Sequence, residues 1–293
     1  MKYRLVQQLK KAYSIKRVCR LLDLSRSGFY EANQRPQRRT NLALEAHLKS
    51  AFAASGRCYG SRRLKVALQE YGYHYGRYKI RGLMRKHGLK PTWKRKFVRT
   101  TDSKHGLPVA ENLLNRQFNP KGPNQAWTSD ISYIRTRSGW LYLAVVMDLF
   151  SRRIIGWAMA SRMQTSLVSD ALRMALQQRC PTQGLLLHSD RGSQYASYEY
   201  QNLLKAHGIV CSMSRKGNCW DNAPMERFFL NLKMERVWQQ DYANQDEAIR
   251  DITGYIVGFY NTCRLHSILN YLPPVVYEQQ KVAKQPIQVS GIT

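Results

Sequence analysis

A β-strand is predicted at Trp127-Thr128-Ser129-Asp130-Ile131-Ser132-Tyr133, where apolar and polar side chains alternate. Two more strand patterns follow closely. Residues 140–147 are apolar and aromatic, and residues 154–159 form another short apolar run. Three such runs close together along the chain favour an antiparallel meander.

After this meander, helical and strand patterns alternate. The pattern predicts an amphipathic helix at 165–178, a buried strand at 185–187, a helix at 198–206, a strand at 209–211, and helices at about 222–238 and 246–263. This order of elements predicts an α/β domain in which helices cover the faces of a mixed sheet.

Two aspartates occupy positions in these strands that suggest chemistry. Asp130 lies inside the first strand, where a carboxylate is costly unless its charge is compensated. Asp190 directly follows the strand at 185–187, and the carboxyl ends of strands in open sheets are where ligands bind. The alternatives are an edge-strand aspartate facing water for Asp130 and a turn-forming aspartate for Asp190.

A third carboxylate, Glu226, begins the helix predicted at 222–238. Asn222 can cap this helix and Pro224 suits its first turn, so Glu226 lies near the helix N-terminus, where the dipole favours an ionised carboxylate. Lys233 follows at i+7 on nearly the same face, where its charge could hold a phosphate. The alternative for Glu226 is the ordinary preference of glutamate for a first turn.

Three carboxylates on two strand ends and one helix could meet in one cleft. Carboxylate and water ligands suit Mg²⁺ or Mn²⁺, and two such ions stabilise the attacking and leaving oxygens of phosphoryl transfer. Water or a DNA 3′-hydroxyl would then be the nucleophile. The residues alone therefore predict a metal-dependent nuclease or transferase.

The charge of the chain points to a polyanionic partner. The formal net charge is +28, and residues 1–122 carry +23 of it, from 29 Lys and Arg against 6 Asp and Glu. Nucleic acid is the expected partner, and a membrane surface is the alternative. Since the chain has neither a long apolar stretch nor a signal-peptide pattern, we expect a cytoplasmic protein without a membrane partner, associated with the nucleoid when on DNA. The six cysteines form no C-x-x-C pair, so free thiols are expected.

Two small helical modules are predicted before the α/β domain. Residues 1–32 fit a helix-turn-helix in which Ser14 and Ser25 cap the helices and Arg26 contacts DNA, although any helical hairpin would fit as well. Residues 33–40 read as a linker.

The second module is predicted at 43–90. Its candidate DNA-contacting residues are Arg62, Arg63, Lys79 and Arg81, and the alternative for each one is a solvated face. We expect a basic connector at 91–120, the catalytic core at 121–283 and a tail at 284–293.

Several motifs together resemble one known family. They are Trp127-x-x-Asp130-Ile131-x-Tyr133, His188-Ser189-Asp190-Arg191-Gly192-Ser193, Asp221-Asn222-Ala223-x-x-Glu226, Leu232-Lys233-x-Glu235 and Tyr260-Asn261-x-x-Arg264-x-His266, and 35 residues separate Asp190 from Glu226. The chain resembles the OrfB-type transposases of frameshift-assembled insertion sequences, which belong to the DDE class and are related to retroviral integrases.

This resemblance implies a ribonuclease H-like fold for 121–283. It implies that Asp130, Asp190 and Glu226 bind two Mg²⁺ ions, and that Lys233 contacts the terminal DNA of the element. It also implies cleavage and joining of DNA strands by transesterification at inverted-repeat ends, as a homo-oligomer on DNA and with an OrfA-type partner or fusion. The alternatives are a non-catalytic helix-turn-helix regulator and a general nuclease of the same fold.

Other polar and aromatic residues near these motifs have structural interpretations. We expect Asp148 to be structural, Glu235 to lie at the surface or in an ion pair, and Trp220 to pack. His188 could shape the site. Arg264 and His266 could either approach DNA or support the core.

Overall fold

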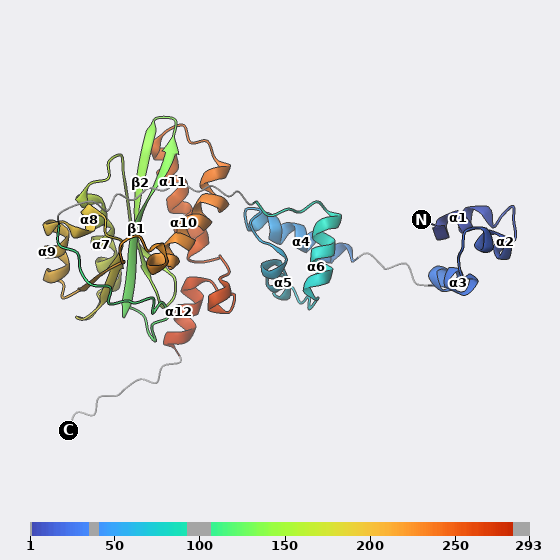
Figure 1. Cartoon of the computed structure of the whole chain (residues 1–293), viewed down its shortest axis with the longest axis horizontal. Helices are drawn as coiled ribbons and strands as arrows, with labels where there is room; N and C mark the ends of the chain where they lie inside the picture. The colour runs from blue at the N-terminus through green and yellow to red at the C-terminus, as the bar shows by residue number, and fades with distance from the viewer. Residues whose placement is uncertain (1, 35–40, 93–106, 284–293) are drawn as a thin grey trace, which may run out of the picture. The chain divides into compact units, whose positions relative to one another are not determined.

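We describe the protein from a computed structural model, in which residues 2–34, 41–92 and 107–283 are described. Residues 35–40 of the predicted linker, 93–106 of the predicted connector and the predicted tail lie outside this part. The chain divides into two compact units, Met1–His47 and Leu48–Thr293, and Figure 1 shows their elements.

The first unit is helical. It contains α1 (Lys2–Leu9), α2 (Ile15–Leu21) and α3 (Arg26–Gln34), packed around Val6, Val18, Cys19 and Phe29. Ser25 accepts a hydrogen bond from the backbone N–H of Gly28 at 3.3 Å, as expected of a capping residue. Ser14 precedes α2, but its side chain makes no capping hydrogen bond, so that prediction was wrong.

A second helical segment belongs to the larger unit. Helix α4 (Leu42–Ala54) begins in the first unit and ends in the second, and α5 (Ser61–Gln69) and α6 (Arg77–Lys86) follow it. Leu64 and Leu68 of α5 and Ile80 and Met84 of α6 are buried. The apolar stripes of the two helices are thus used for packing, and the basic residues of α6 face solvent together with Arg62 of α5.

Five strands form one mixed sheet in the order β3-β2-β1-β4-β5. They are β1 (Ala126–Thr136), β2 (Gly139–Asp148), β3 (Ile154–Ala160), β4 (Leu186–Ser189) and β5 (Val210–Met213). The first three are antiparallel neighbours, whereas β1 with β4 and β4 with β5 are parallel. The predicted mixed α/β class is confirmed, and this strand order is that of the ribonuclease H-like fold.

Helices cover both faces of the sheet (Figure 1). On one face, α7 (Thr165–Arg179), α8 (Ser193–Ala196) and α9 (Tyr198–Ala206) pack in a core with Trp127 and Leu187. On the other face, α10 (Ala223–Glu235), α11 (Gln245–Gly254) and the π-helix η3 (Tyr255–Tyr260) pack in a core with Leu143 and Val145. A Cβ at Gly156 of β3 would overlap the carbonyl oxygen of Ala171, so α7 approaches the sheet as closely as only glycine allows.

Helix ends differ from the sequence expectation. The segment predicted as one helix at 222–238 contains the end of a 3₁₀ turn, η1 (Cys219–Asn222), then α10 and then η2 (Val237–Gln239). The segment predicted at 246–263 contains α11 and η3. Hydrophobic periodicity persists through such changes of helix type, so it could not reveal them.

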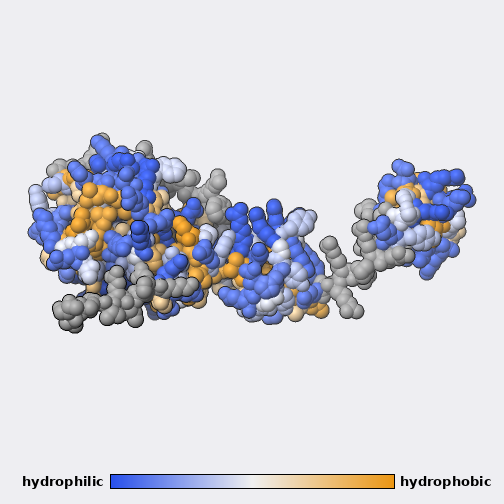
Figure 2. All heavy atoms as spheres, turned by 90° about the horizontal axis from the view of Figure 1, so that it is seen from below, coloured by the Kyte–Doolittle hydropathy of each residue, from blue (hydrophilic) through white to orange (hydrophobic). Residues whose placement is uncertain are grey.

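The last described elements are η4 (Ser267–Leu269) and α12 (Pro274–Val282). Glu278 of α12 accepts hydrogen bonds from both Nη atoms of Arg179 at 2.6 and 2.7 Å and from the Ser151 hydroxyl at 2.6 Å. This charged cluster fixes α12 to the core. Figure 2 shows that hydrophilic side chains cover much of the face in view, with apolar patches between them.

Candidate active site

Asp130 lies in β1 and is half-buried. Its Oδ1 accepts a hydrogen bond from the backbone N–H of Ile131 at 2.7 Å. Burial raises the pKa of Asp130 well above its ordinary value, the charges of Asp190 and Glu226 raise it further, and Lys233 opposes the rise. Asp190, Glu226 and Lys233 therefore lie close enough to Asp130 to act on its charge.

The sheet brings Asp190 next to Asp130. Strands β1 and β4 are parallel neighbours, with Thr128 paired to His188. This register directs Asp130, two residues further along β1, and Asp190, directly after the end of β4, toward the same edge of the sheet. Asp190 Oδ1 also accepts the backbone N–H of Gly192 at 2.9 Å, and a Cβ at Gly192 would lie 3.0 Å from that oxygen.

Glu226 lies in the first turn of α10 and is exposed, and partial burial raises its pKa. Asn222, which precedes the helix, makes no capping hydrogen bond, so its predicted role was wrong. Its Oδ1 accepts from the Thr128 hydroxyl at 2.5 Å, and its amide donates to the Ser129 carbonyl oxygen at 3.3 Å. Asn222 therefore ties the start of α10 to β1, two residues before Asp130.

Lys233, two turns after Glu226, is half-buried, and its Nζ lies 4.6 Å from the centroid of the Tyr133 ring. Burial lowers the pKa of Lys233, and Asp130 opposes this. A cation held over an aromatic face beside carboxylates is positioned by the protein before any ligand arrives.

No three His, Cys, Asp or Glu side chains within residues 2–34, 41–92 and 107–283 are gathered closely enough to hold a metal ion in the conformations described. Burial and the neighbouring charges of Asp190 and Glu226 nevertheless make the ionised form of Asp130 costly, and a bound cation would offset that cost. Carboxylate oxygens are the ligands that a hard dication prefers, so the chemistry of the donor set fits such an ion.

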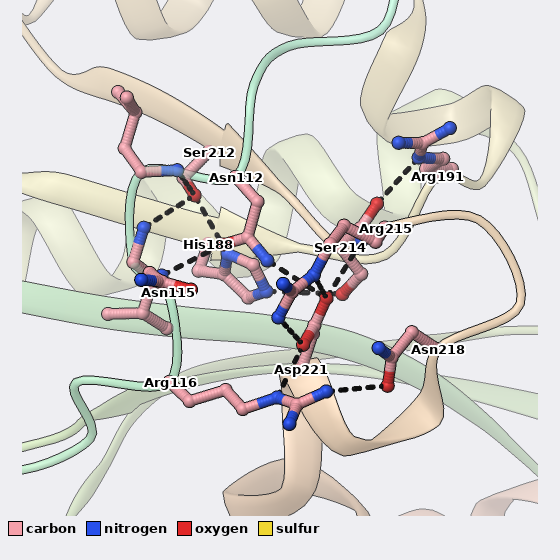
Figure 3. Close-up of polar contacts among 12 residues, drawn as sticks. Asn112, Asn115, Arg116, His188, Arg191, Ser212, Ser214, Arg215, Asn218 and Asp221 are labelled. Atoms are coloured by element: carbon pink, nitrogen blue, oxygen red, sulfur yellow. Dashed lines mark hydrogen bonds and ion pairs between the residues drawn. The ribbon is translucent and has the colours of Figure 1, made fainter.

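A polar network lies directly before α10 (Figure 3). Asp221 accepts hydrogen bonds from the backbone, Nε and Nη2 of Arg215, from Nε of Arg116 and from Nδ2 of Asn112, all at 2.8–3.0 Å. These donors lower the pKa of Asp221, with Arg215 contributing most. Asp221 thereby joins the 112–116 segment, which we had predicted to lie in a connector, to the turn that leads into α10. The sequence motif contained Asp221, but nothing in it identified these distant donors.

His188 is buried in the same network. Its two ring nitrogens lie 2.9 and 3.1 Å from the hydroxyl oxygens of Ser212 and Ser214 (Figure 3). Burial lowers the pKa of His188 to about 4. The imidazole is therefore neutral at physiological pH and links β4 to β5 beneath the start of the Asp190 turn.

Three expectations about neighbouring residues are now decided. Glu235 forms a buried ion pair with Arg264, whose Nη2 and Nε lie 2.6 and 2.8 Å from its oxygens, so Glu235 is not a surface residue and Arg264 supports the core. Trp220 is 70% exposed, so the prediction that it packs was wrong. Asp148 is fully buried and accepts the backbone N–H groups of Asn124 and Phe150, as a structural residue would.

The predicted DNA-contacting residues lie in different environments. Arg26, Arg62, Lys79 and Arg81 are exposed. Lys79 Nζ lies 3.5 Å from the centroid of the Tyr75 ring. Arg63 is instead half-buried, 3.9 Å from Glu235 and above the Tyr59 ring.

Comparisons with known proteins show which family the chain belongs to. Two profiles described as integrase core domains match residues 120–219 and 207–274, and a profile described as an HTH-like domain matches residues 38–97. The chain is 41% identical over 288 residues to the transposase InsF for insertion sequence IS3A of Escherichia coli (strain K12), which covers 97% of this chain and 100% of that relative. The chain belongs to the IS3-type transposases.

Other similar proteins include a 31 kDa protein of insertion element IS600 from Shigella sonnei, 44% identical over 268 residues, or 90% of this chain and 98% of that one. Among solved structures, an intasome of simian T-cell lymphotropic virus with a PP2A regulatory subunit is 17% identical, with a TM-score of 0.47 over 73% of this chain and 70% of that chain. The HTLV-2 integrase catalytic core in complex with magnesium is also 17% identical, with a TM-score of 0.42 over 54% of this chain and 97% of that chain.

The predicted family is therefore confirmed. As an IS3-type OrfB transposase, the protein is a DNA-binding polynucleotidyl transferase rather than a non-catalytic regulator. Its integrase core implies dependence on a divalent metal ion. In the described part of the chain, no helix has both the length and the apolar character needed to cross a membrane.

Proposed function

We propose that this IS3-type transposase cuts and joins DNA at the inverted-repeat ends of its element, with Asp130, Asp190 and Glu226 as ligands of two Mg²⁺ or Mn²⁺ ions. One observation carries the proposal. The turn after β4 and the first turn of α10 bring Asp190 and Glu226 close enough to Asp130 of β1 to act on its charge, as Lys233 also does. The bound ions would stabilise the attacking and leaving oxygens of the phosphodiester.

The protein's own residues position the substrate. Lys233, held over the Tyr133 ring, contacts a non-bridging oxygen of the scissile phosphate and so places it against the carboxylates. Asn222 fixes α10, and with it Glu226, to β1. The nucleophile comes from outside the chain, as water for cleavage and as a DNA 3′-hydroxyl for joining.

DNA is held in this proposal by exposed basic residues of the helical modules, including Arg26, Arg62, Lys79 and Arg81. Arg63 differs from these residues because it is half-buried beside Glu235. DNA would have to reach into the protein surface to contact it. Several copies assemble on the paired ends, with an OrfA-type partner or fusion. Co-expression with the upstream reading frame, followed by a transposition assay, tests the partner.

The experiment compares Asp130→Asn, Asp190→Asn and Glu226→Gln with Asp170→Asn, an exposed aspartate of α7 paired only with the exposed Arg173. Strand cleavage and joining are measured on an oligonucleotide carrying one inverted-repeat end, with Mg²⁺ and with EDTA. We expect each of the three variants to lose at least about 100-fold in rate while still binding DNA, because ion-mediated stabilisation is worth several kcal/mol.

The control Asp170→Asn is expected to match wild type. Cleavage at wild-type rates in any of the three carboxylate variants would refute the ligand assignment. Cleavage without joining and without preference for the inverted repeat would instead indicate a general nuclease.

A further inference from the structure

A cavity lies on a different side of α10 from the candidate active site. Its volume is about 510 Å³. Arg227, Phe228 and Asn231 of α10 line it, and these residues point roughly 100–200° around the helix axis from Glu226. Arg63 of α5 and the loop that contains His266 form the opposite walls.

The two sides of this cavity belong to one compact unit and are joined by direct contacts. The Tyr59 hydroxyl accepts the backbone N–H of Leu265 at 2.8 Å and donates to the Cys263 carbonyl oxygen at 3.3 Å. Arg63 lies 3.9 Å from Glu235 of α10. A molecule in the cavity would therefore contact the α5 segment and the catalytic core together.

The lining has a strong excess of positive charge. It contains four arginines, namely Arg63, Arg152, Arg227 and Arg264, and a single acidic residue, Glu235. Glu235 is already occupied, because it accepts two hydrogen bonds from Arg264 and one from the Tyr255 hydroxyl. Glu235 thus offsets the charge of Arg264 and lies near Arg63, so four arginines share one carboxylate in the lining and an anion would meet an excess of positive charge.

Two buried polar atoms of the lining have no hydrogen-bond partner among the described residues. They are Nη1 of Arg152 and Nε2 of His266, and each residue is only 7% exposed. The other Nη of Arg152 donates to Asn119 at 3.0 Å, so one arm of the guanidinium is fixed and the second is left for a ligand. A buried polar group without a partner destabilises the protein, and an acceptor on a bound ligand would offset that cost.

Much of the remaining lining is apolar, and three of its residues are aromatic. Phe118, Met147, Phe228, Tyr260 and Ile268 all contribute to it. A lone phosphate would leave this surface unused, since drug-sized pockets have volumes of about 300–1,000 Å³. A ligand with an anionic group and a flat apolar group would satisfy both parts of the lining.

We propose that this cavity binds one nucleotide, its phosphate on Arg152, Arg227 and His266 and its base against Phe118 and Ile268. The nucleotide is either a free nucleoside monophosphate or one residue of a DNA single strand, and the binding chemistry is the same for both. The single-strand source rests on the DNA-processing function proposed above, whereas the binding site itself does not.

Binding is measured by calorimetry on the full chain in EDTA, with three probes: dAMP, a 5′-phosphorylated hexathymidylate and inorganic phosphate. Arg227→Ala removes an exposed arginine of the lining, and Arg250→Ala, an exposed arginine of α11 outside it, is the matched control. Arg152→Gln removes a buried donor, and its melting temperature is recorded to show that the variant is folded. Asp190→Asn is included because it disables the proposed active site and not the cavity.

We expect dAMP to bind more tightly than inorganic phosphate, with affinity lowered about 3–10-fold by Arg227→Ala and at least about 10-fold by Arg152→Gln, since charge-assisted hydrogen bonds are the strong ones. Arg250→Ala and Asp190→Asn should bind dAMP as wild type does, even if Asp190→Asn no longer cleaves DNA. If Arg227→Ala lowers the affinity for the hexanucleotide more than the affinity for dAMP, the bound nucleotide belongs to a DNA strand. If it lowers both affinities equally, the ligand is a free nucleotide.

Three outcomes overturn the proposal. The first is that neither dAMP nor the hexanucleotide binds at millimolar concentration. The second is that both bind to folded Arg227→Ala and Arg152→Gln as tightly as to the wild type. The third is that inorganic phosphate binds as tightly as dAMP, which would leave the apolar lining without a role. Each of these can occur while strand cleavage by the wild type is intact, so the failure of this proposal is distinct from the failure of the proposed function.

Discussion

Replacing Glu235 by Gln should destabilise the catalytic core more than any exposed substitution. The side chains of Glu235 and Arg264 are 5% and 1% exposed, and two hydrogen bonds of 2.6 and 2.8 Å join them. The Tyr255 hydroxyl donates to the same carboxylate at 2.7 Å. The amide oxygen of glutamine can keep the contacts made by one carboxylate oxygen, but the guanidinium of Arg264 is left buried without a counter-charge.

The expected cost follows from that uncompensated charge. Removing one partner of a buried ion pair costs about 3–5 kcal/mol, whereas replacing both by apolar residues of similar volume is often neutral. For a core of this size the loss corresponds to a fall in Tm of roughly 6–20 °C. The double variant Glu235→Leu with Arg264→Met should therefore be more stable than Glu235→Gln alone.

Urea denaturation followed by tryptophan fluorescence is the assay. Five tryptophans, at positions 127, 140, 157, 220 and 238, belong to the catalytic domain and report on its unfolding. The exposed pair Arg137 and Asp241 supplies the control, because Asp241→Asn should change stability by less than about 1 kcal/mol. If Glu235→Gln behaved like Asp241→Asn, the account of the buried pair would be wrong.

Three further predictions concern packing, pH and DNA binding. Gly156→Ala should lower the free energy of unfolding by about 1–3 kcal/mol or more, because its Cβ would overlap the backbone of α7; an unchanged urea midpoint would contradict this. The folded chain protonates His188 only near pH 4, while the unfolded chain does so near pH 6.5, so stability is complete above about pH 6.5 and falls by roughly 3 kcal/mol as the pH drops through that interval. His188→Gln should flatten this part of the stability–pH curve, and a curve of unchanged shape would count against it. Arg62→Ala should weaken DNA binding and reduce the slope of log K against log salt by about 0.9, while Arg250→Ala should not; equal slopes in a salt titration would reject a phosphate contact at Arg62.

Local patterns were enough to predict the elements of the core, but not how they pair. Alternation at 127–133 and the apolar runs at 140–147 and 154–159 predicted three neighbouring strands, and β1–β3 are those strands. That β4 pairs with β1 rather than with β3 depends on contacts between distant segments, which periodicity does not encode. The resemblance to transposases supplied that topology.

In the candidate site, too, local patterns predicted the carboxylates but not the contacts between distant segments. Asp130, Asp190 and Glu226 were predicted because a carboxylate in a strand, directly after a strand or in the first turn of a helix is visible in the local sequence pattern. The role of Asn222 was misjudged because its local pattern favours a cap, whereas a hydroxyl from β1, 94 residues away in sequence, competes for its side chain. The residues that line the cavity beside α10 come from segments separated by up to 210 positions, so no window of sequence could have gathered them.

The contact between Thr128 and Asn222 has a practical consequence. Both side chains are uncharged, so this contact between the strand that carries Asp130 and the helix that carries Glu226 is not weakened by the salt that screens charges. Concentrated buffer that strips nucleic acid from the basic modules should leave this scaffold intact. The enzyme can then be purified free of bound polynucleotide and returned to dilute buffer with its catalytic framework already assembled.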